Sequence, residues 1–126
     1  MILKLDGMSG TLTRHLYNNI CSFENDVRYL EIGTWKGSSL ISSLYGNNHV
    51  KAVVIDNWSQ FGGPRDEFDK NIQKFIPNAN LEVIENESFS IDLKSTFGDR
   101  KFNIYLYDGD HSAEAQSKAL TYYKPL

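Results

Sequence analysis

Three segments of the sequence carry side chains that could bind a nucleotide-like ligand or move a proton. They are residues 31–39 (Glu-Ile-Gly-Thr-Trp-Lys-Gly-Ser-Ser), the single acid Asp56, and residues 108–111 (Asp-Gly-Asp-His). Each follows an apolar run, which predicts that all three lie where strands end. Carboxylates there can accept hydrogen bonds from hydroxyl groups, and an imidazole can take up a proton near neutral pH.

Residues 31–39 have the pattern of a ligand-binding loop between a strand and a helix. Gly33 permits a tight turn or a positive φ, and Gly37 permits the helix to begin close to the strand or to a ligand. Glu31 would repel the pyrophosphate of a dinucleotide, whereas a ligand with positive groups, such as the ammonium and sulfonium of S-adenosylmethionine, would accept a carboxylate there. The alternative is that Glu31 caps or pairs within the fold.

Asp56 stands twenty-three residues after Gly33, close to the spacing of an acid that binds a ribose. One carboxylate can accept hydrogen bonds from both ribose hydroxyls, so this position fits a nucleoside. The alternative is a solvated aspartate at a strand end. Trp58 also has two interpretations, either as a neighbour of an adenine or a lid, or as an ordinary packing residue.

The segment 108–111 supports three kinds of chemistry. His111 could remove a proton from a hydroxyl or amine of a substrate. Asp108 and Asp110 could instead hold a divalent cation, as the DxD motif of a glycosyltransferase would. In the third interpretation, Asp110 and Ser112 only cap the helix that follows.

Hydrophobic periodicity predicts the elements that position these segments. Apolar runs rich in β-branched and aromatic residues predict strands at 27–32, 50–55, 81–84 and 102–107. Helical spacing predicts helices at 9–21, 38–45, 65–76, 88–97 and 112–123. The first helix places Leu12, Leu16 and Ile20 on one apolar stripe. This alternation is typical of right-handed βαβ units, and so of an α/β Rossmann-like three-layer sandwich with a mainly parallel sheet.

The predicted sheet has about four strands, in one domain that covers residues 1–126 with an N-terminal helical segment at 1–24. We expect the fourth strand beside the first, with ligands at the carboxyl ends of the strands. Ile104 and Leu106 have the pattern of a buried strand, yet no fifth strand follows to pair its outer edge. We therefore expect either a truncated chain or a homo-oligomer that covers this edge.

Composition excludes several classes of function. The 126 residues carry a formal net charge of -3, which argues against a sequence-independent nucleic-acid binder. The single cysteine, Cys21, excludes an internal disulfide framework and a CxxC site, and it fits a reducing compartment. No run approaches the roughly 18 apolar residues of a membrane-spanning helix. We expect no membrane partner and a cytoplasmic location.

Taken together, residues 30–39, 54–56 and 107–112 resemble the class I S-adenosylmethionine-dependent methyltransferases. Within them, the chain is most similar to the small-molecule methyltransferases whose fourth strand ends in an Asp-Gly-Asp-His motif, and the resemblance extends from about Arg28 to Leu126. It implies a transferase that moves a methyl group from S-adenosylmethionine to an oxygen or nitrogen of a small-molecule acceptor. Two features depart from the family: Trp35 replaces the usual central glycine, and the family fold has seven strands.

The resemblance also implies roles for individual residues. Asp108 would lie close to the methyl donor and His111 near the acceptor, while Asn86 or Ser88 and Phe89 would border the adenine. No metal is expected. Related cation-dependent enzymes take further ligands from the strand that follows the fourth, and this sequence has no such strand. The implied cofactor-binding residues are Glu31, Gly33, Thr34, Gly37, Ser38, Asp56, Asn57, Trp58, Ser88 and Asp108. The alternatives are a non-catalytic Rossmann-like binding module or a DxD-type glycosyltransferase.

Overall fold

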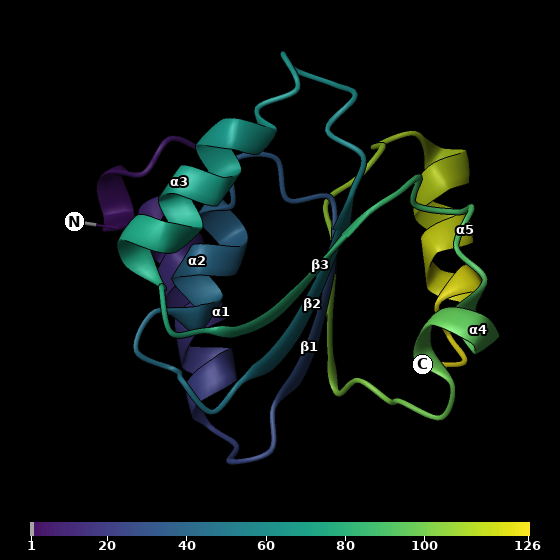
Figure 1. The fold of residues 1–126 in the computed structure, drawn as a ribbon, viewed down its shortest axis with the longest axis horizontal. Coiled ribbons are helices and arrows are strands. Elements are labelled where there is room, and N and C mark those ends of the chain that lie inside the picture. The colour runs from purple at the N-terminus through teal and green to yellow at the C-terminus, as the bar shows by residue number, and fades with distance from the viewer. Residues whose placement is uncertain (1) are drawn as a thin grey trace.

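The computed structural model describes residues 2–126 and has a four-stranded parallel sheet between two helical layers (Figure 1). The strands are β1 (Arg28–Ile32), β2 (Lys51–Asp56), β3 (Asn80–Glu85) and β4 (Ile104–Tyr107). Their order is β3-β2-β1-β4, and every neighbouring pair is parallel. The predicted fold class and the position of β4 beside β1 are therefore confirmed.

The helices divide between the two faces of the sheet. A short 3-10 helix, η1 (Ile2–Lys4), and helices α1 (Thr11–Ser22), α2 (Ser38–Leu44) and α3 (Arg65–Phe75) lie on one face, with α4 (Leu93–Phe97) and α5 (Ala113–Tyr122) on the other (Figure 1). The helix predicted at 88–97 is shorter than expected. The Asp92 side chain accepts hydrogen bonds from the backbone N–H groups of Lys94 and Ser95, which fixes the start of α4 there.

The two central strands are buried on both faces, as expected for parallel strands covered by helices. Successive side chains of β1 alternate between two apolar clusters, with Tyr29 in the cluster beneath α2 and α3 and Leu30 and Ile32 in the cluster beneath α4 and α5. In β2, Val54 joins the first cluster and Ile55 the second. The core therefore holds the carboxyl ends of β1 and β2 rigidly beside one another.

Helix α1 docks on α2 through polar groups. The Asn18 side chain donates to the carbonyl oxygens of Ser42 and Tyr45, both at 2.8 Å, and the Asn47 side chain donates back to the Asn18 carbonyl at 3.1 Å. The predicted apolar stripe faces solvent instead, since Leu12 is 84% exposed and Leu16 is 55% exposed. The periodicity that predicted the helix was right, and its apolar stripe faces solvent because α1 docks through the polar side chain of Asn18.

Strand β4 forms one edge of the sheet and is less buried than its sequence suggested. Ile104 and Leu106 are half-buried and Tyr105 is 37% exposed, because no strand of the described chain lies outside β4. No helix among residues 2–126 is long and apolar enough to cross a lipid bilayer.

Candidate functional site

The carboxyl ends of the strands open into a cavity of about 560 Å³. Loops after all four strands line it, together with part of the N-terminal segment. This is the place where ligands bind in doubly wound sheets. Of the predicted site residues, those that line the cavity are Gly33, Thr34, Ser38, Asp56, Asn57, Trp58, Ser88, Asp108 and His111. Glu31 and Gly37 do not belong to the lining.

Gly33 is the point where the loop after β1 meets the loop after β4. Its φ is +81°, and a β-carbon there would lie 2.5 Å from the carbonyl oxygen of Asp108 and 2.8 Å from the backbone nitrogen of Gly109. Among the amino acids, only glycine, which has no β-carbon, can adopt this backbone conformation and approach another segment so closely. The glycine predicted for a tight turn is thus needed to bring two parts of the cavity wall together.

The Asp56 carboxylate fastens the loops after β1 and β2 to one another. Its Oδ2 accepts backbone N–H bonds from Thr34 at 2.7 Å and from Trp35 at 2.9 Å, and its Oδ1 accepts one from Trp58 at 2.8 Å. These three bonds orient the carboxylate, and of its roughly four lone-pair sites they leave one, on Oδ1, for a ligand hydroxyl.

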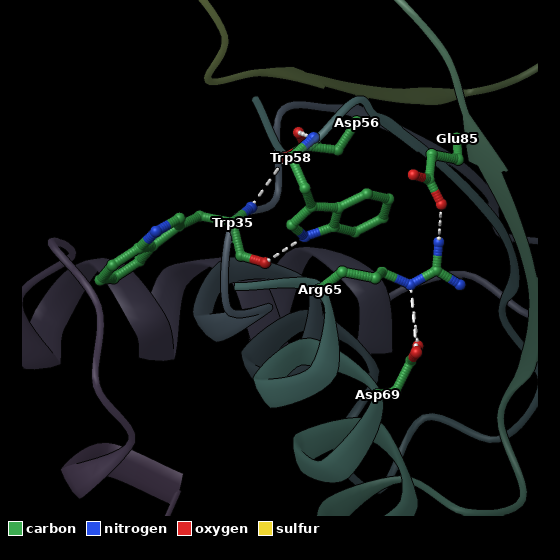
Figure 2. A network of polar contacts seen from close by, with 6 residues as sticks. All are labelled: Trp35, Asp56, Trp58, Arg65, Asp69 and Glu85. Atoms are coloured by element: carbon green, nitrogen blue, oxygen red, sulfur yellow. Dashed lines mark hydrogen bonds and ion pairs between the residues drawn. The ribbon is translucent and has the colours of Figure 1, made fainter. Parts of the chain in front are cut away.

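The Trp58 indole supports this arrangement and lies between the Trp35 backbone and the Arg65 side chain (Figure 2). Its indole N–H donates to the Trp35 carbonyl at 2.8 Å, and its ring packs on Phe68 with the Arg65 guanidinium 4.5 Å from the ring centroid. Arg65 is held in turn by ion pairs with Asp69 at 3.1 Å and Glu85 at 2.7 Å, so its charge is already paired. Trp58 is only 6% exposed, which makes it mainly a packing residue of the loop.

Both tryptophans adopt a backbone conformation that L-residues rarely take. Trp35, in the loop after β1, has a φ of 49°, and so do Trp58 and Phe61 in the loop after β2. In this left-handed conformation, residues other than glycine are strained by about 1–2 kcal/mol each. Such strain is common at functional sites. The chain therefore follows an unusual path at Trp35 even though the central glycine of the family motif is absent.

Glu31 lies beneath the cavity and is fully buried. The Tyr29 hydroxyl donates to its Oε2, and the Ser39 hydroxyl donates to its Oε1 at 2.7 Å. Burial raises the pKa of Glu31 to about 7, although these two hydrogen bonds act in the opposite direction. The carboxylate links β1 to α2, which is the structural alternative that the sequence left open.

Gly37 also serves the fold. It has a φ of +85°, and a β-carbon there would lie 3.1 Å from the Phe68 ring of α3. The close approach is therefore to a neighbouring helix.

The loop after β3 forms another wall of the cavity and is held from α5. The Tyr123 hydroxyl donates to the Ser88 carbonyl, and Phe89 packs among Tyr107, Tyr122 and Tyr123 while it lines the cavity. The Asn57 side chain donates to Glu87, so this wall is also joined to the loop after β2. Phe89 therefore packs in the core and also borders the cavity.

The segment after β4 is more open. The His111 ring lies 3.0 Å from Asp108 Oδ1, and their side chains are 73% and 56% exposed. Asp110 accepts a hydrogen bond from the Ser112 backbone N–H, and Ser112 caps α5 through a bond from the Ala115 N–H. The capping role predicted for Asp110 and Ser112 is confirmed.

The sequence did not identify several residues of the cavity. The most informative is Tyr17 of α1, whose pKa is raised by burial, then by the charges of Asp108 and Glu31, so its phenol stays protonated near these acids. The N-terminal segment can lie next to the cavity because residue 7 is a glycine. A β-carbon at Gly7 would overlap the Ser38 side chain. No local pattern marks such residues, since their place depends on how α1 packs on α2. The others outside the predicted segments are Met8, Ser9, Ser59, Gln60, Phe61 and Glu87. Trp35, Ser39, Gly109 and Asp110 also line the cavity and belong to the predicted segments 31–39 and 108–111.

One buried polar atom supports a polar ligand in this cavity. Thr34 Oγ1 is buried without a well-formed hydrogen bond in the described part of the chain, although its proximity lowers the pKa of Glu31. Buried hydroxyls normally have a partner, and Thr34 lines the cavity beside Asp56. A nucleoside with hydroxyl and amine groups fits this set of acceptors and donors.

Solved structures with the same fold include proteins described as methyltransferases. A protein described as a caffeoyl-CoA O-methyltransferase from Staphylococcus aureus has a TM-score of 0.73 and 17% identity, over 94% of this chain and 54% of that one. Rv0187 from MTB, solved with its cofactor bound, has a TM-score of 0.68 and 19% identity, over 94% and 53%. A protein described as an O-methyltransferase from Klebsiella pneumoniae has a TM-score of 0.57 and 18% identity, over 95% and 54%.

At these identities the likeness shows the fold, and this chain spans about half the length of those proteins. None of the curated protein sequences compared with the chain matches it. A family of methyltransferase domains, however, matches residues 30–126, which is more than half of the chain and includes all three predicted site segments. This match confirms the resemblance found in the sequence, and the chain belongs to the methyltransferase domain family.

Proposed function

We propose that this chain binds S-adenosylmethionine in the cavity at the carboxyl ends of its strands and takes part in methyl transfer to a small molecule. The observation that carries the proposal is the Asp56 carboxylate, which three backbone N–H bonds orient at the wall of a cavity of about 560 Å³. Ligand cavities of small molecules have volumes of roughly 300–1,000 Å³.

The residues present fit this cofactor. Asp56 Oδ1 would accept a hydrogen bond from a ribose hydroxyl, and the Thr34 hydroxyl, which is buried in the adjoining loop without a well-formed hydrogen bond, offers a further polar group. Ser88 and Phe89 would border the adenine. We do not assign Glu31 a direct contact, because it is fully buried and bonded to Tyr29 and Ser39.

When bound, S-adenosylmethionine supplies an electrophilic methyl group with a good leaving group. The protein would contribute mainly position, since holding donor and acceptor in line supplies much of the rate of such a transfer. His111 is exposed beside Asp108 and would accept the proton of an acceptor hydroxyl or amine. Asp108 would orient that imidazole.

A titration with S-adenosylhomocysteine tests the proposal. Asp56→Ala leaves three N–H groups unpaired and removes the ribose acceptor, so affinity should fall at least about tenfold. Asp69→Ala is a matched control, because Asp69 pairs with Arg65 and does not line the cavity. Isothermal calorimetry on variants with an unchanged circular dichroism spectrum measures the effect. Equal affinity of Asp56→Ala and the unaltered chain would contradict the assignment.

A binding module without turnover is the second candidate, because the His111 side chain that would take up the proton is 73% exposed. A chain that binds S-adenosylhomocysteine but transfers no methyl group to any of a panel of phenols and amines would support this candidate. Methyl transfer that is lost in His111→Ala would exclude it.

The homo-oligomer expected from the sequence stays a prediction. It rests on the outer edge of β4, which no strand of the described chain pairs. Light scattering on the purified chain tests it: a dimer would support coverage of this edge by a second copy, and a stable monomer would contradict it.

A further inference from the structure

The cavity wall has an uneven distribution of charge. Four carboxylates line it, those of Asp56, Glu87, Asp108 and Asp110. Among the residues of the described chain that line the cavity there is no lysine or arginine, and His111 is the one side chain that could carry a positive charge. Whether the His111 ring is protonated or neutral, the segment 108–111 has a negative net charge, because it contains both Asp108 and Asp110.

The cations nearest to the cavity are already engaged. Lys36 pairs with Asp6 at 2.7 Å and Glu67 at 2.9 Å, and Arg65 pairs with two acids of its own. Arg14 is buried and donates to the carbonyl oxygen of Ser9 at 3.1 Å, behind the cavity wall. Lys118 lies over the Phe89 ring, 4.7 Å from its centroid, and does not line the cavity.

The mouth of the cavity carries a second, independent feature. Met8 and Phe61 both line the cavity, yet they are 78% and 70% exposed. The Trp35 indole N–H donates to the Phe61 carbonyl at 3.2 Å, and its ring points away from Trp58 and Arg65 (Figure 2). Large apolar side chains that remain exposed beside a cavity are typical of contact surfaces for an apolar ligand.

From these two features we infer that the methyl acceptor is a neutral or positively charged molecule with an apolar body, and not a phosphate or carboxylate anion. The inference rests on the proposed function and names the class of acceptor for the same cavity. An anionic acceptor would face carboxylates with no lysine or arginine among the described lining residues to offset them. A single charge contact of this kind changes affinity by roughly tenfold.

Three phenols that share a 4-hydroxyphenyl ring with a two-carbon side chain test the inference, because the group at the end of this side chain differs in charge. Tyramine is a cation, 4-ethylphenol is neutral, and 3-(4-hydroxyphenyl)propionate is an anion. Each is titrated by calorimetry into the chain saturated with S-adenosylhomocysteine. We expect tyramine to bind at least about tenfold more tightly than the propionate, with 4-ethylphenol between them.

Two charge-neutral variants locate the effect. Asp110→Asn keeps an oxygen for the Ser112 N–H and should narrow the ratio of tyramine to propionate affinity about threefold. Asp99→Asn makes the same change of net charge in the turn before β4, at the amino ends of the strands and away from the cavity, and should leave the ratio unchanged.

The outcomes separate the two proposals. If S-adenosylhomocysteine binds but the anion binds as tightly as the cation, or tyramine does not bind, the acceptor inference is overturned and the cofactor proposal stands. A ratio that Asp99→Asn narrows as much as Asp110→Asn would also overturn it. If S-adenosylhomocysteine itself does not bind, the proposed function fails first.

Discussion

At one end of the cavity the Asp56 carboxylate accepts three backbone N–H bonds, whereas at the other end the Asp108 carboxylate has a single hydrogen bond, to the His111 ring. We call these the Asp56 end (33–35 and 56–58) and the His111 end (108–111). The Asp56 end is tied into the core through Trp58 and Phe68, while Asp108 and His111 are exposed.

This difference suggests a division of work. Backbone groups held by several bonds cannot shift without breaking all of them, so the Asp56 end is suited to hold a ligand of fixed shape. The His111 end has few partners and can adjust to different acceptors or protonation states. Within one cavity, the part expected to bind the cofactor is thus preorganised and the part expected to do chemistry is adaptable.

The largest effect is expected where the two ends touch. Gly33→Ala places a β-carbon 2.5 Å from the Asp108 carbonyl oxygen at a φ of +81°, so the free energy of unfolding should fall by more than about 2 kcal/mol. Gly46→Ala is the matched control, because Gly46 has a φ of +79° and no atom near its β-carbon position. Urea unfolding measures both variants. Equal losses would show that only backbone strain matters and that the contact with Asp108 does not.

A second prediction concerns the support beneath the Asp56 end. Burial raises the pKa of Glu31 from 4.5 to about 7, so the folded chain keeps a proton that the unfolded chain has released between these values. The free energy of unfolding should therefore fall as pH rises through this window, by about 3 kcal/mol in total. Glu31→Gln has no proton to lose and should not show this fall.

Urea unfolding at several pH values between 4 and 8 measures the effect. Glu24→Gln is the control, because Glu24 is exposed and its loss should leave the dependence unchanged. If Glu31→Gln keeps the same fall in stability with pH as the unaltered chain, the buried carboxyl is not its source.

The smallest effect is expected at the His111 end. The His111 side chain is 73% exposed, so His111→Ala should change the free energy of unfolding by less than about 0.5 kcal/mol. Affinity for S-adenosylhomocysteine should change less than about threefold, because the imidazole is assigned to the acceptor. Calorimetry beside Asp56→Ala gives the comparison. A loss of affinity as large as that of Asp56→Ala would remove the division between the two ends.

Much of the site could be predicted because strand ends are local features. The apolar runs before Gly33, Asp56 and Asp108 predicted strands, and parallel strands bring their carboxyl ends to one edge of the sheet. The motif in residues 31–39 also pointed to the family that residues 30–126 match. Periodicity predicted the strands, whereas the family and the order of the strands in space followed from the resemblance of residues 30–39, 54–56 and 107–112.

Glu31 and Leu12 show where sequence patterns reach their limit. An acid at a strand end looks the same whether it faces a ligand or the core, and only the packing of α2 turns Glu31 toward Ser39. An apolar stripe indicates a helix but not which neighbour covers it, and the hydrogen bonds of Asn18 decide that Leu12 faces solvent.

By itself, the sequence determined the parallel α/β fold, the four strands and the acids at their ends, because backbone conformation follows from side-chain periodicity over a few residues. Only the tertiary structure decided that Gly33 meets Asp108, that Trp58 supports the loop after β1, and that Tyr17 reaches the cavity. Each of these contacts joins segments far apart in the chain. Their geometry depends on how helices and loops pack on the sheet, which no local pattern encodes.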